Sequence, residues 1–461
     1  MILRPYQHDM IDQTRALFKQ NIRSVLLQLS TGGGKTLMTA SMLNTAANKG
    51  MASWFIVHRR ELVKQTIQAF MDIGIKKFGV VSSGFAEAKG FPIQICSIQT
   101  LIRRHMYLPE PKFIAWDECH HCSAGTYVKI YNAYLKAFHV GLTATPHRLD
   151  GTGLRKYFSE MVNGPKMSWL IENGFLCPYK LFAPSGISVS GVHSQMGDYK
   201  RNELANIVDR PTITGDAIKH YTKHAAGKRA VVFCVSVEHS KHVVGQFNQA
   251  GILAAHVDGE TPIEERDMAI RRFKHGEIKI LSNVELFGEG FDLPALEVAI
   301  LLRPTQSLGL YLQQVGRALR PSPGKQHALI LDHAGNCERH GLPDEDREWS
   351  LDGRDKKKSS GGGLSVKVCP KCFAAQFPGS EKCRYCGFVF EINSRPIDER
   401  DGELVEVDLA NLRRERKMSQ GKCETVEDLI AEGKKRGYKH AERWAHHVFQ
   451  ARQSRKLAGA R

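Results

Sequence analysis

The sequence predicts an α/β protein built from two tandem parallel-sheet lobes, followed by a small four-cysteine zinc ribbon and a helical C-terminal tail. Three observations lead to this fold class. Short β-branched runs alternate with helical stretches twice along the chain, two Cys-x-x-Cys pairs follow, and positive charge gathers at the C-terminal end. Strands that alternate with helices indicate a parallel sheet covered on both faces. The length of 461 residues, about three times the ~150 residues of a typical domain, agrees with two large domains and smaller appendages.

The β-branched runs define the two lobes. In the first lobe they cover residues 25–29, 54–57, 93–96, 113–116 and 140–142, and in the second 230–235, 253–257, 278–281, 298–302 and 328–331. Gly and Pro residues interrupt the pattern between positions 163 and 184. We therefore predict lobe 1 over 1–170, lobe 2 over 171–338, a flexible linker over 339–365, the zinc ribbon over 366–392 and a basic helical tail over 393–461.

Charge and composition narrow the classes of partner. The 65 Lys and Arg residues exceed the 48 Asp and Glu residues, and the net charge of +17 favours nucleic acid over a membrane surface. No apolar run approaches the ~18 residues of a membrane span, and the N-terminus has no secretion signal, so we expect a cytoplasmic protein. The odd count of 11 cysteines predicts reduced thiols and one metal site rather than disulfides.

A phosphate-binding loop is predicted between the first strand and the helical stretch 37–47. Its residues are Ser30, Thr31, Gly32, Gly33, Gly34, Lys35 and Thr36. The glycines let backbone N–H groups face phosphates, Lys35 reaches the β and γ phosphates of ATP, and Thr36 offers a hydroxyl to Mg²⁺. Leu29 replaces the usual first glycine, which leaves a flexible glycine turn as the alternative.

A carboxylate pair stands at the end of the strand 113–116, where parallel sheets place their ligand sites. We assign Asp117 to Mg²⁺ and Glu118 to the attacking water. The alternative for this pair is two solvated acids. The cysteines and histidines of residues 119–122 also raise the possibility of zinc, but adjacent residues converge poorly on one tetrahedral ion.

With these motifs the sequence resembles the superfamily 2 helicases and translocases with a DEAH-like box. Arg4-Pro5-Tyr6-Gln7 is similar to the adenine-reading motif of that group, so the resemblance implies that Arg4 and Gln7 contact the nucleotide, with Gln7 on the adenine. Residues 57–62 and 97–101 resemble two motifs that bind the nucleic-acid backbone, which implies contacts from Arg59, Arg60, Gln99 and Thr100. Thr143-Ala144-Thr145-Pro146 resembles the motif that couples hydrolysis to lobe movement.

The second lobe carries the remaining motifs of the resemblance. Residues 283–292 resemble the glycine–acid motif, which implies nucleotide contacts from Gly290 and Asp292. Residues 313–320 resemble the arginine motif that faces the ATP of the first lobe, which implies roles for Gln313, Arg317 and Arg320. The residues agree with this, because a spreading γ-phosphate charge needs cations and arginines three apart share a helical face. Solvated surface arginines are the alternative.

The resemblance covers about residues 1–335 and implies two RecA-like lobes. Within the superfamily the sequence looks most similar to bacterial RadD-type repair helicases, through its Asp-Glu-Cys-His box and residues 302–305, 315–317 and 331–336. It differs from that family in having only one obvious four-cysteine cluster and a different C-terminal tail.

The zinc site is predicted from cysteine spacing. Cys369, Cys372, Cys383 and Cys386 form a Cys-x₂-Cys-x₁₀-Cys-x₂-Cys pattern that gives Zn²⁺ four thiolates in a tetrahedron. Four thiols without a metal are the alternative. Nearby lysines slightly favour a ribbon that grips DNA over one that only holds the tail in place.

The C-terminal tail holds +8 of the net charge within residues 412–461. Residues 425–428 resemble a capping box that opens one helix, and a second helix carries apolar residues at i, i+3, i+4, i+7 and i+8 from Ala441 to Phe449. A helical hairpin packed on its own core is the simpler interpretation. A docking face for a protein partner or a single strand is the other.

Together these features predict an ATP-dependent helicase or translocase, with DNA favoured over RNA as its partner. An RNA helicase or an annealing translocase is the first alternative, because contacts to the phosphate backbone do not identify the sugar. The second alternative is an ATP-gated loading factor that acts through its ribbon and tail. A restriction-type motor is a further possibility, although no nuclease constellation of carboxylates and lysine stands out.

Overall fold

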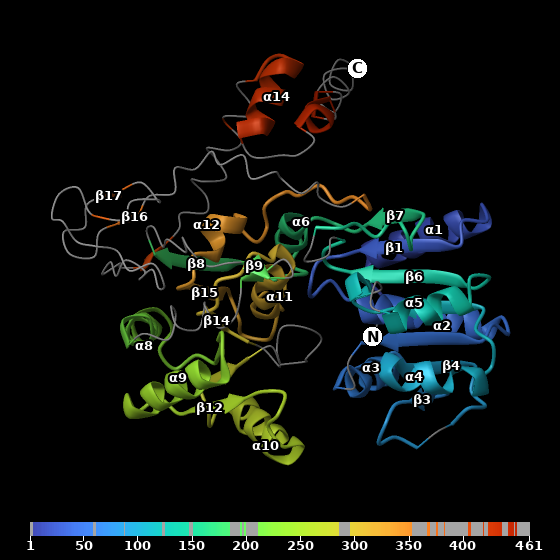
Figure 1. Cartoon of the computed structure of the whole chain (residues 1–461), viewed down its shortest axis with the longest axis horizontal. Coiled ribbons are helices and arrows are strands. Elements are labelled where there is room, and N and C mark those ends of the chain that lie inside the picture. The colour runs from blue at the N-terminus through green and yellow to red at the C-terminus, as the bar shows by residue number, and fades with distance from the viewer. Residues whose placement is uncertain are drawn as a thin grey trace. The chain divides into compact units, whose positions relative to one another are not determined.

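A computed structural model describes most of the two predicted lobes and part of the remaining chain (Figure 1). The described residues are 3–58, 61–86, 88–121, 125–146, 151–184, 194–195, 198–199, 211–284, 296–352, 367–368, 375–376, 382, 404–406, 418, 423–435, 441–446 and 448–449. The chain divides into two compact units, Met1–Val405 and Glu406–Arg461. The first unit contains two seven-stranded sheets, which confirms the α/β class and its two parallel sheets.

The first sheet has the strand order β3-β4-β2-β5-β6-β1-β7, and all its strands are parallel. The strands are β1 (Ser24–Gln28), β2 (Ser53–Val57), β3 (Gly79–Val81), β4 (Ile93–Ser97), β5 (Phe113–Trp116), β6 (Phe138–Thr143) and β7 (Glu160–Asn163). The central strands are buried along their whole length, as expected when helices cover both faces.

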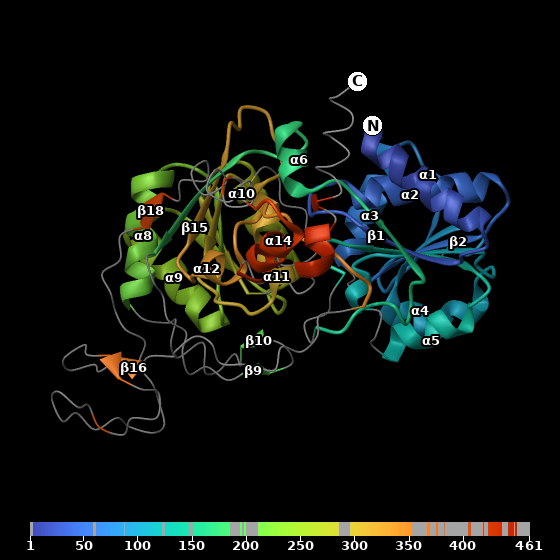
Figure 2. The same ribbon diagram turned by 90° about the horizontal axis from the view of Figure 1, so that it is seen from above.

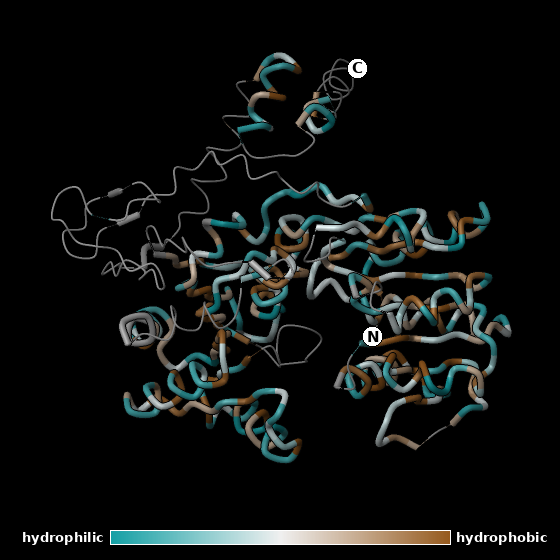
Figure 3. The backbone as a smooth tube through the Cα atoms, in the orientation of Figure 1, coloured by the Kyte–Doolittle hydropathy of each residue, from teal (hydrophilic) through white to brown (hydrophobic). Residues whose placement is uncertain are grey.

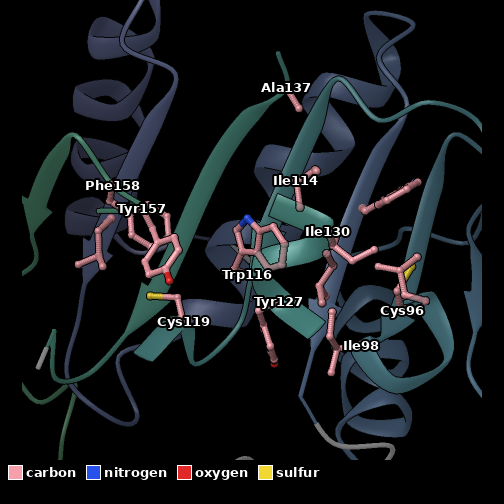
Figure 4. Packing of buried hydrophobic residues seen from close by; sticks show 14 of the residues in the cluster. Cys96, Ile98, Ile114, Trp116, Cys119, Tyr127, Ile130, Ala137, Tyr157 and Phe158 are labelled. Carbon is pink, nitrogen blue, oxygen red and sulfur yellow. The ribbon is translucent and has the colours of Figure 1, made fainter. Parts of the chain in front are cut away.

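Helices cover this first sheet on both sides. Figure 2 shows α1 (Pro5–Lys19), α2 (Lys35–Asn48) and α3 (Glu61–Asp72) on one face, with α4 (Ile98–Arg104) and α5 (Gly125–Ala133) on the other. Two short 3₁₀ turns, η1 (His105–Tyr107) and η2 (Cys119–His121), complete the first lobe. The core under α4 and α5 contains Trp116, Tyr127 and Phe158 (Figure 4). Cys119 is buried in the same core, which argues against the zinc alternative for residues 119–122.

The core of the first lobe also holds a polar pair. Trp116 Nε1 donates a hydrogen bond to His139 Nδ1 over 3.1 Å, and His139 Nε2 lies 3.0 Å from the carbonyl oxygen of Tyr134. Because Nδ1 must accept, His139 is neutral and carries its proton on Nε2. Burial, which outweighs the opposing hydrogen bond to Tyr134, lowers the pKa of His139 to about 4.

The second sheet repeats the architecture with the order β12-β13-β11-β14-β15-β8-β18. Its strands are β8 (Tyr179–Pro184), β11 (Ala230–Phe233), β12 (Ala254–Val257), β13 (Ile280–Asn283), β14 (Val298–Leu301), β15 (Ala328–Asp332) and β18 (Leu404–Glu406). The strands from β12 to β8 are parallel. Figure 3 shows hydrophobic residues along the strands of both sheets, as a core between helical layers requires.

The helices of the second lobe are α8 (Pro211–Ala225), α9 (Val237–Gln249), α10 (Ile263–Lys274), α11 (Leu308–Ala318) and α12 (Asn336–His340). Ser236 caps α9 and Ser307 caps α11, each by accepting a backbone N–H bond of 3.1 Å with its hydroxyl. The helix α6 (Met167–Glu172) lies in the connection between the lobes, so the boundary that we predict at 170 falls inside a helix. Two small antiparallel pairs, β9 (Ser194–Gln195) with β10 (Asp198–Tyr199) and β16 (Lys367–Val368) with β17 (Ala375–Gln376), accompany the sheets.

The start of the predicted linker is packed rather than flexible. Residues 342–352, which we call the return segment, run back to the first lobe: Leu351 is buried in the core cluster of that lobe. Asp352 accepts two hydrogen bonds from Arg155, and Asp346 pairs with Lys166 at 2.8 Å. The expectation of a flexible linker over 339–365 is therefore wrong for its first part. The sequence suggested a linker because of the Lys, Ser and Gly run that begins only at Lys356.

The second compact unit contains α14 (Val426–Lys435). At its N-terminus Thr425 Oγ1 accepts a bond from Asp428 N, and Asp428 accepts one from Thr425 N, which is the reciprocal pattern of a capping box. Leu429 packs with Ala445 and Trp444 of the following helical residues, and a Cβ atom on Gly433 would lie 3.0 Å from Ala441 Cβ. The apolar stripe thus packs against α14, as the hairpin interpretation expects.

The predicted zinc ligands Cys369, Cys372, Cys383 and Cys386 lie outside the described residues. Within the part of the chain that is described, no three His, Cys, Asp or Glu side chains are arranged to hold a metal ion. Among the described helices we find none with the length and hydropathy of a membrane span.

Candidate functional site

The candidate site lies at the carboxyl edge of the first sheet. The chain leaves β1 at Gln28, β5 at Trp116 and β6 at Thr143, and these three strands are neighbours or next neighbours in the sheet. Hydrogen bonds join the segments beyond two of the strand ends: Leu29 N donates to Thr143 O over 3.0 Å, and Gln28 Nε2 donates to Ala144 O over 2.9 Å. The predicted phosphate loop, carboxylate pair and coupling motif therefore share one edge, where parallel sheets bind ligands.

The phosphate loop has the backbone geometry that its glycines predict. Gly32 and Gly34 adopt φ angles of +86° and +85°, in the left-handed region that glycine enters without strain. Gly33 N donates to Ser30 O over 3.0 Å and closes the turn. Gly34 is the N-cap residue of α2 and has no side chain that could cap the helix. The first backbone N–H groups of this 14-residue helix therefore have no side-chain cap, and they lie next to the loop. Thr36 lies in the first turn of the same helix.

A second layer of side chains supports the loop from α1. Tyr6 OH donates to Gly33 O over 2.8 Å, and Gln7 Nε2 donates to the carbonyl oxygens of Gly33 and Gly34 over 3.0 and 3.2 Å. Arg4 N donates to Gln7 Oε1, and the Arg4 guanidinium contacts the ring of Phe175. Gln7 is buried and binds the loop backbone here, so the structure places it beside the predicted nucleotide site but shows a supporting role rather than a free amide.

The carboxylate pair follows β5 in a strained turn. Glu118 has a φ of +45°, which is unusual for a residue with a side chain and typical of functional sites. Its Oε2 atom is buried, accepts no hydrogen bond within the described part of the chain, and lies 3.5 Å from His120 Nδ1. His120 Nδ1 lies 3.3 Å from Thr143 Oγ1, and Thr143 Oγ1 donates to Thr145 O over 2.9 Å. His120 thereby links the carboxylates to the coupling motif.

Electrostatic interactions connect the loop, the carboxylates and the second lobe. Burial lowers the pKa of Lys35, the carboxylates of Glu118 and Asp117 act in the opposite direction, and Arg317 and Arg320 lower it further. Burial and the charge of Glu118 raise the pKa of Asp117 to about 6, against the opposing effect of Lys35 and His58. A buried carboxylate with a raised pKa is the kind of group that a bound cation would stabilise. Asp117, together with Thr36 in the first turn of α2, fits the needs of Mg²⁺.

The arginine motif lies on α11 and just beyond its end. Arg317 is 4% exposed and Gln313 is also buried, which excludes simple solvation for both, while Arg320 is half-buried. Lys325 Nζ donates to Arg320 O over 2.9 Å and to Leu296 O over 2.7 Å, and so fixes the chain after the helix. The pKa effect on Lys35 shows that both arginines belong to the electrostatic surroundings of the phosphate loop.

The predicted nucleic-acid contacts are described only in part. Gln99 Nε2 donates to His58 O, and Thr100 Oγ1 accepts from Ser97 Oγ over 3.0 Å, so the ends of β2 and β4 are joined at the same sheet edge. Gln99 is exposed there. Arg59, Arg60, Gly290 and Asp292 lie outside the described residues.

Several supporting residues were not predicted from the sequence. Tyr6 holds the loop, Leu176 contacts it, and Gly309 and Gly316 of α11 meet first-lobe threonines. In the sequence, the only sign of these residues is the seven-residue spacing of the two glycines within a helix. The contacts of the glycines with the threonines could not be predicted, because they depend on the packing of distant segments.

Comparison with protein families identifies both lobes. Residues 1–148 match the family described as the res subunit of type III restriction enzymes, and residues 213–322 match the helicase conserved C-terminal domain.

Individual relatives agree with these matches. A 51.5 kDa protein of Lactococcus phage (isolate 7-9) is 36% identical over 394 residues, which cover 84% of each protein. IRC3 of Saccharomyces cerevisiae, provisionally named an ATP-dependent helicase, is 29% identical over 72% of this chain, and the chain spans about half, 52%, of its length. The DNA-bound structure of the ATP-dependent type ISP restriction–modification enzyme LlaBIII shares the fold, with a TM-score of 0.55 and 18% identity over 72% of this chain and 28% of the enzyme.

Proposed function

This chain belongs to the superfamily 2 helicases and translocases, and we propose that it is an ATP-driven motor that acts on DNA. The observation that carries the proposal is the convergence of a left-handed glycine loop, a carboxylate pair of which Glu118 is buried and Asp117 half-buried, and two second-lobe arginines around Lys35. Phosphoryl transfer needs this combination, because its catalysis consists of positioning and of stabilising charge on the phosphoryl oxygens.

Each residue has a defined role in this proposal. The loop backbone and Lys35 bind the phosphates of ATP, and Asp117 with Thr36 would hold Mg²⁺, which when bound neutralises charge on the β and γ phosphates. Glu118 orients the attacking water. Its buried Oε2 atom accepts no hydrogen bond within the described residues and can therefore accept one from the water. The strained backbone at φ +45° keeps the carboxylate in the site.

The second lobe contributes the remaining charge. Arg317 and Arg320 approach the phosphate loop from α11 and stabilise the transferring phosphoryl group, with Gln313 on the same helix. Gly290 and Asp292 are proposed nucleotide contacts by resemblance. ATP and DNA each favour the closed pair of lobes, so that each ligand strengthens the effect of the other.

DNA is favoured over RNA for two reasons. The net charge of +17 suits a polyanion, and the first lobe belongs to a family named after subunits of restriction enzymes, whose substrates are DNA. Arg59, Arg60, Gln99 and Thr100 are the proposed backbone contacts at the carboxyl edge of the first sheet. Contacts to phosphates position nucleic acid and do not read its sequence, so sequence-independent binding is expected.

One set of ATPase assays tests the proposal. Turnover is measured for the full chain alone and with single-stranded DNA, duplex DNA, branched DNA or RNA, with Lys35→Ala as the inactive control. Stimulation by any of the DNA substrates supports the proposal, and stimulation by RNA alone would replace DNA with RNA as the partner. Absence of ATPase under all conditions would overturn it.

We also propose that the cysteine pairs bind one Zn²⁺ per chain and that the basic tail adds a salt-sensitive grip on nucleic acid. Elemental analysis of freshly purified protein tests the zinc proposal: we expect one equivalent of zinc per chain, and finding none would contradict it.

Truncation at Asn393 tests the grip of the tail on nucleic acid, because it should flatten the dependence of the binding constant on salt. Each phosphate contact contributes a slope of about −0.9 to log K against log salt on duplex DNA, or about −0.7 on single strands. An unchanged slope would leave the tail as a packed helical hairpin or a docking site for a protein partner.

A further inference from the structure

Two glycines inside α11 break a local rule of helix design. Gly309 and Gly316 lie seven residues apart in an 11-residue helix, the one that carries Arg317. Glycine in a helix interior is less stable than alanine, because it loses more conformational freedom on folding, and this applies to Gly316 more than to Gly309, which is the second residue of the helix. Such departures from local preference are expected where function compensates for them.

The surroundings of both glycines explain why a side chain would not fit. A Cβ atom on Gly316 would lie 2.6 Å from Thr31 Cβ and 2.9 Å from Thr31 Cγ2, in the phosphate loop. A Cβ atom on Gly309 would lie 2.9 Å from Thr145 Oγ1, in the coupling motif. All three distances are shorter than real Cβ contacts, so either the helix or the threonine that it meets would have to move.

The same contact is visible from the side of the loop. A Cβ atom on Gly32 would lie 3.9 Å from Gly316 O and 3.7 Å from Arg320 Cγ. A side chain at the apex of the phosphate loop would therefore reach the backbone of α11 and the stem of Arg320. Both first-lobe threonines belong to the motifs that surround the predicted ATP phosphates.

The glycines share a helix face with functional residues. Residues at i, i+4 and i+7 line one side of a helix, which places Gly309, Gln313 and Gly316 along one strip, and Arg320 follows two residues after the end of the helix. Small residues at two of these positions bring the helix axis closer to the first lobe, and the reach of Gln313 and Arg320 toward the nucleotide depends on that distance.

We propose that Gly309 and Gly316 are positioning residues that set the distance between α11 and the phosphate loop, and thereby place the arginines for phosphoryl transfer. This inference rests on the proposed ATPase function. It assigns no contact with the nucleotide to the glycines themselves. A displacement of about 1 Å at a catalytic group lowers turnover by about 10- to 100-fold, so a single methyl group is enough to test it.

Gly316→Ala is the first variant, with Gly245→Ala as its matched control. Gly245 also lies inside a helix, α9, but a Cβ atom there would meet nothing within 4 Å. Both substitutions favour the helix intrinsically. We expect Gly316→Ala to lower the kcat of the DNA-stimulated ATPase by about 10- to 100-fold with little change in ATP binding, and Gly245→Ala to leave kcat unchanged. Equal kcat values for the two variants would overturn the proposal.

A second pair of substitutions keeps the test decisive if Gly316→Ala folds poorly. Gly309→Ala meets only the Oγ1 atom of Thr145 at close range, since Thr145 Cβ lies at 3.8 Å. Thr145→Ala removes Oγ1 and should make room for the new methyl group. The factor by which Gly309→Ala lowers kcat should therefore be several-fold larger in the parent protein than in the Thr145→Ala background. Equal costs in the two backgrounds would contradict the steric mechanism.

The two levels of inference fail in different ways. A parent protein without nucleotide hydrolysis would refute the proposed function. A parent that hydrolyses ATP, together with a Gly316→Ala variant of normal kcat, would refute the positioning role alone.

Discussion

The two lobes share an architecture but treat the carboxyl edges of their sheets differently. At the edge of the first sheet, the pKa of Lys35 is lowered and that of Asp117 is raised to about 6, each chiefly by burial. These shifts disfavour the charged forms that catalysis needs. Contacts within the protein therefore stabilise the charged forms of these two side chains only in part.

At the corresponding edge of the second sheet, the polar groups beside β12 and β13 are hydrogen-bonded to one another. Ser240 Oγ lies 2.6 Å from His256 Nδ1 and 2.6 Å from Ser282 Oγ, and His256 Nε2 lies 3.0 Å from Asp258 Oδ2. Asp258 Oδ1 also accepts bonds from the backbone N–H and hydroxyl of Thr261, both at 2.7 Å. Although burial acts in the opposite direction, the hydrogen bonds from Thr261 and His256 lower the pKa of Asp258 to about 2.

The difference separates two uses of the same fold. The protein stabilises the charge of Asp117 in the first lobe only in part, whereas hydrogen bonds within the second lobe stabilise the charge of Asp258. The chain Ser240, His256, Asp258 has the residue types of a hydrolytic triad, but Ser240 is fully buried and cannot meet a substrate. Function must therefore be argued from exposure and partners, not from residue types alone.

The largest effect should come from the arginine that crosses toward the first lobe. Arg320→Ala should lower ATP turnover by on the order of 10³ or more while sparing ATP binding, as for other arginine fingers. Steady-state kinetics and nucleotide-binding titrations measure the two quantities separately. Arg272→Ala, at an exposed arginine on α10, is the control. Normal turnover in Arg320→Ala would mean that the arginine only packs.

The next effect concerns the water-orienting carboxylate. Glu118→Gln keeps the shape of the side chain but removes its charge, so turnover should fall by about 10²-fold or more while bound ATP is retained. Lys35→Ala should instead weaken ATP binding. A rapid filter-binding assay of labelled ATP distinguishes trapping from loss of binding. Hydrolysis by Glu118→Gln at the parent rate would show that the role is wrongly assigned.

A matched pair of aspartate substitutions tests the comparison between the edges directly. At pH 8 Asp117→Asn removes a buried charge with a raised pKa and should raise the melting temperature by a few degrees, at about 2–4 °C per kcal/mol. Asp258→Asn removes an acceptor of several hydrogen bonds and should lower it. Differential scanning calorimetry without nucleotide measures both. Shifts of the same sign would end the distinction that we draw between the two edges.

The smallest expected effect is a pH dependence of stability that arises in the core of the first lobe and not at its sheet edge. His139 is neutral in the folded state, with a pKa lowered to about 4, whereas an unfolded histidine titrates near 6.5. The folded state then binds fewer protons, so stability is lost as the pH falls from about 6.5 to about 4. Asp117 acts in the opposite direction over an overlapping range, because its raised pKa favours the fold at low pH.

This pH effect is best measured in the Asp117→Asn background, where the opposing titration is absent. Urea midpoints from pH 7 to pH 4 should decline. His139→Gln in that background is expected to flatten the decline, and a profile that is unchanged by this substitution would show that His139 does not cause it.

Much of the fold could be predicted from the sequence because its central strands are continuous apolar runs. The predicted strand 113–116 coincides with β5, and the other predicted strands match to within a few residues. The short edge strand β7 was missed, because it has four residues whose two ends are exposed and polar, and so gives no apolar run. The register of β8 against β15 is likewise a tertiary feature, since these strands lie far apart along the chain.

The candidate site shows the same division. Lys35, Asp117 and Glu118 could be named from local motifs, since their chemistry depends on neighbours in sequence. The contact of Gly316 with Thr31 could not, because it joins segments that only the folded lobes bring together. The return segment was also missed, since its few apolar residues lie in a mostly polar stretch and the place of Leu351 in the first-lobe core depends on the path of the chain.

The return segment gives the two lobes a second mechanical connection. The polypeptide passes from the first sheet to the second between β7 and β8, and comes back to the first lobe where Leu351 is buried and Arg155 holds Asp352. A load that separates the lobes is therefore shared by one covalent connection and by a second segment that is anchored by non-covalent packing. Two links resist twisting and sliding more than bending, so relative movement of the lobes is restrained toward a hinge-like path. The exposed ion pairs contribute little to this restraint, and the buried leucine is its main anchor.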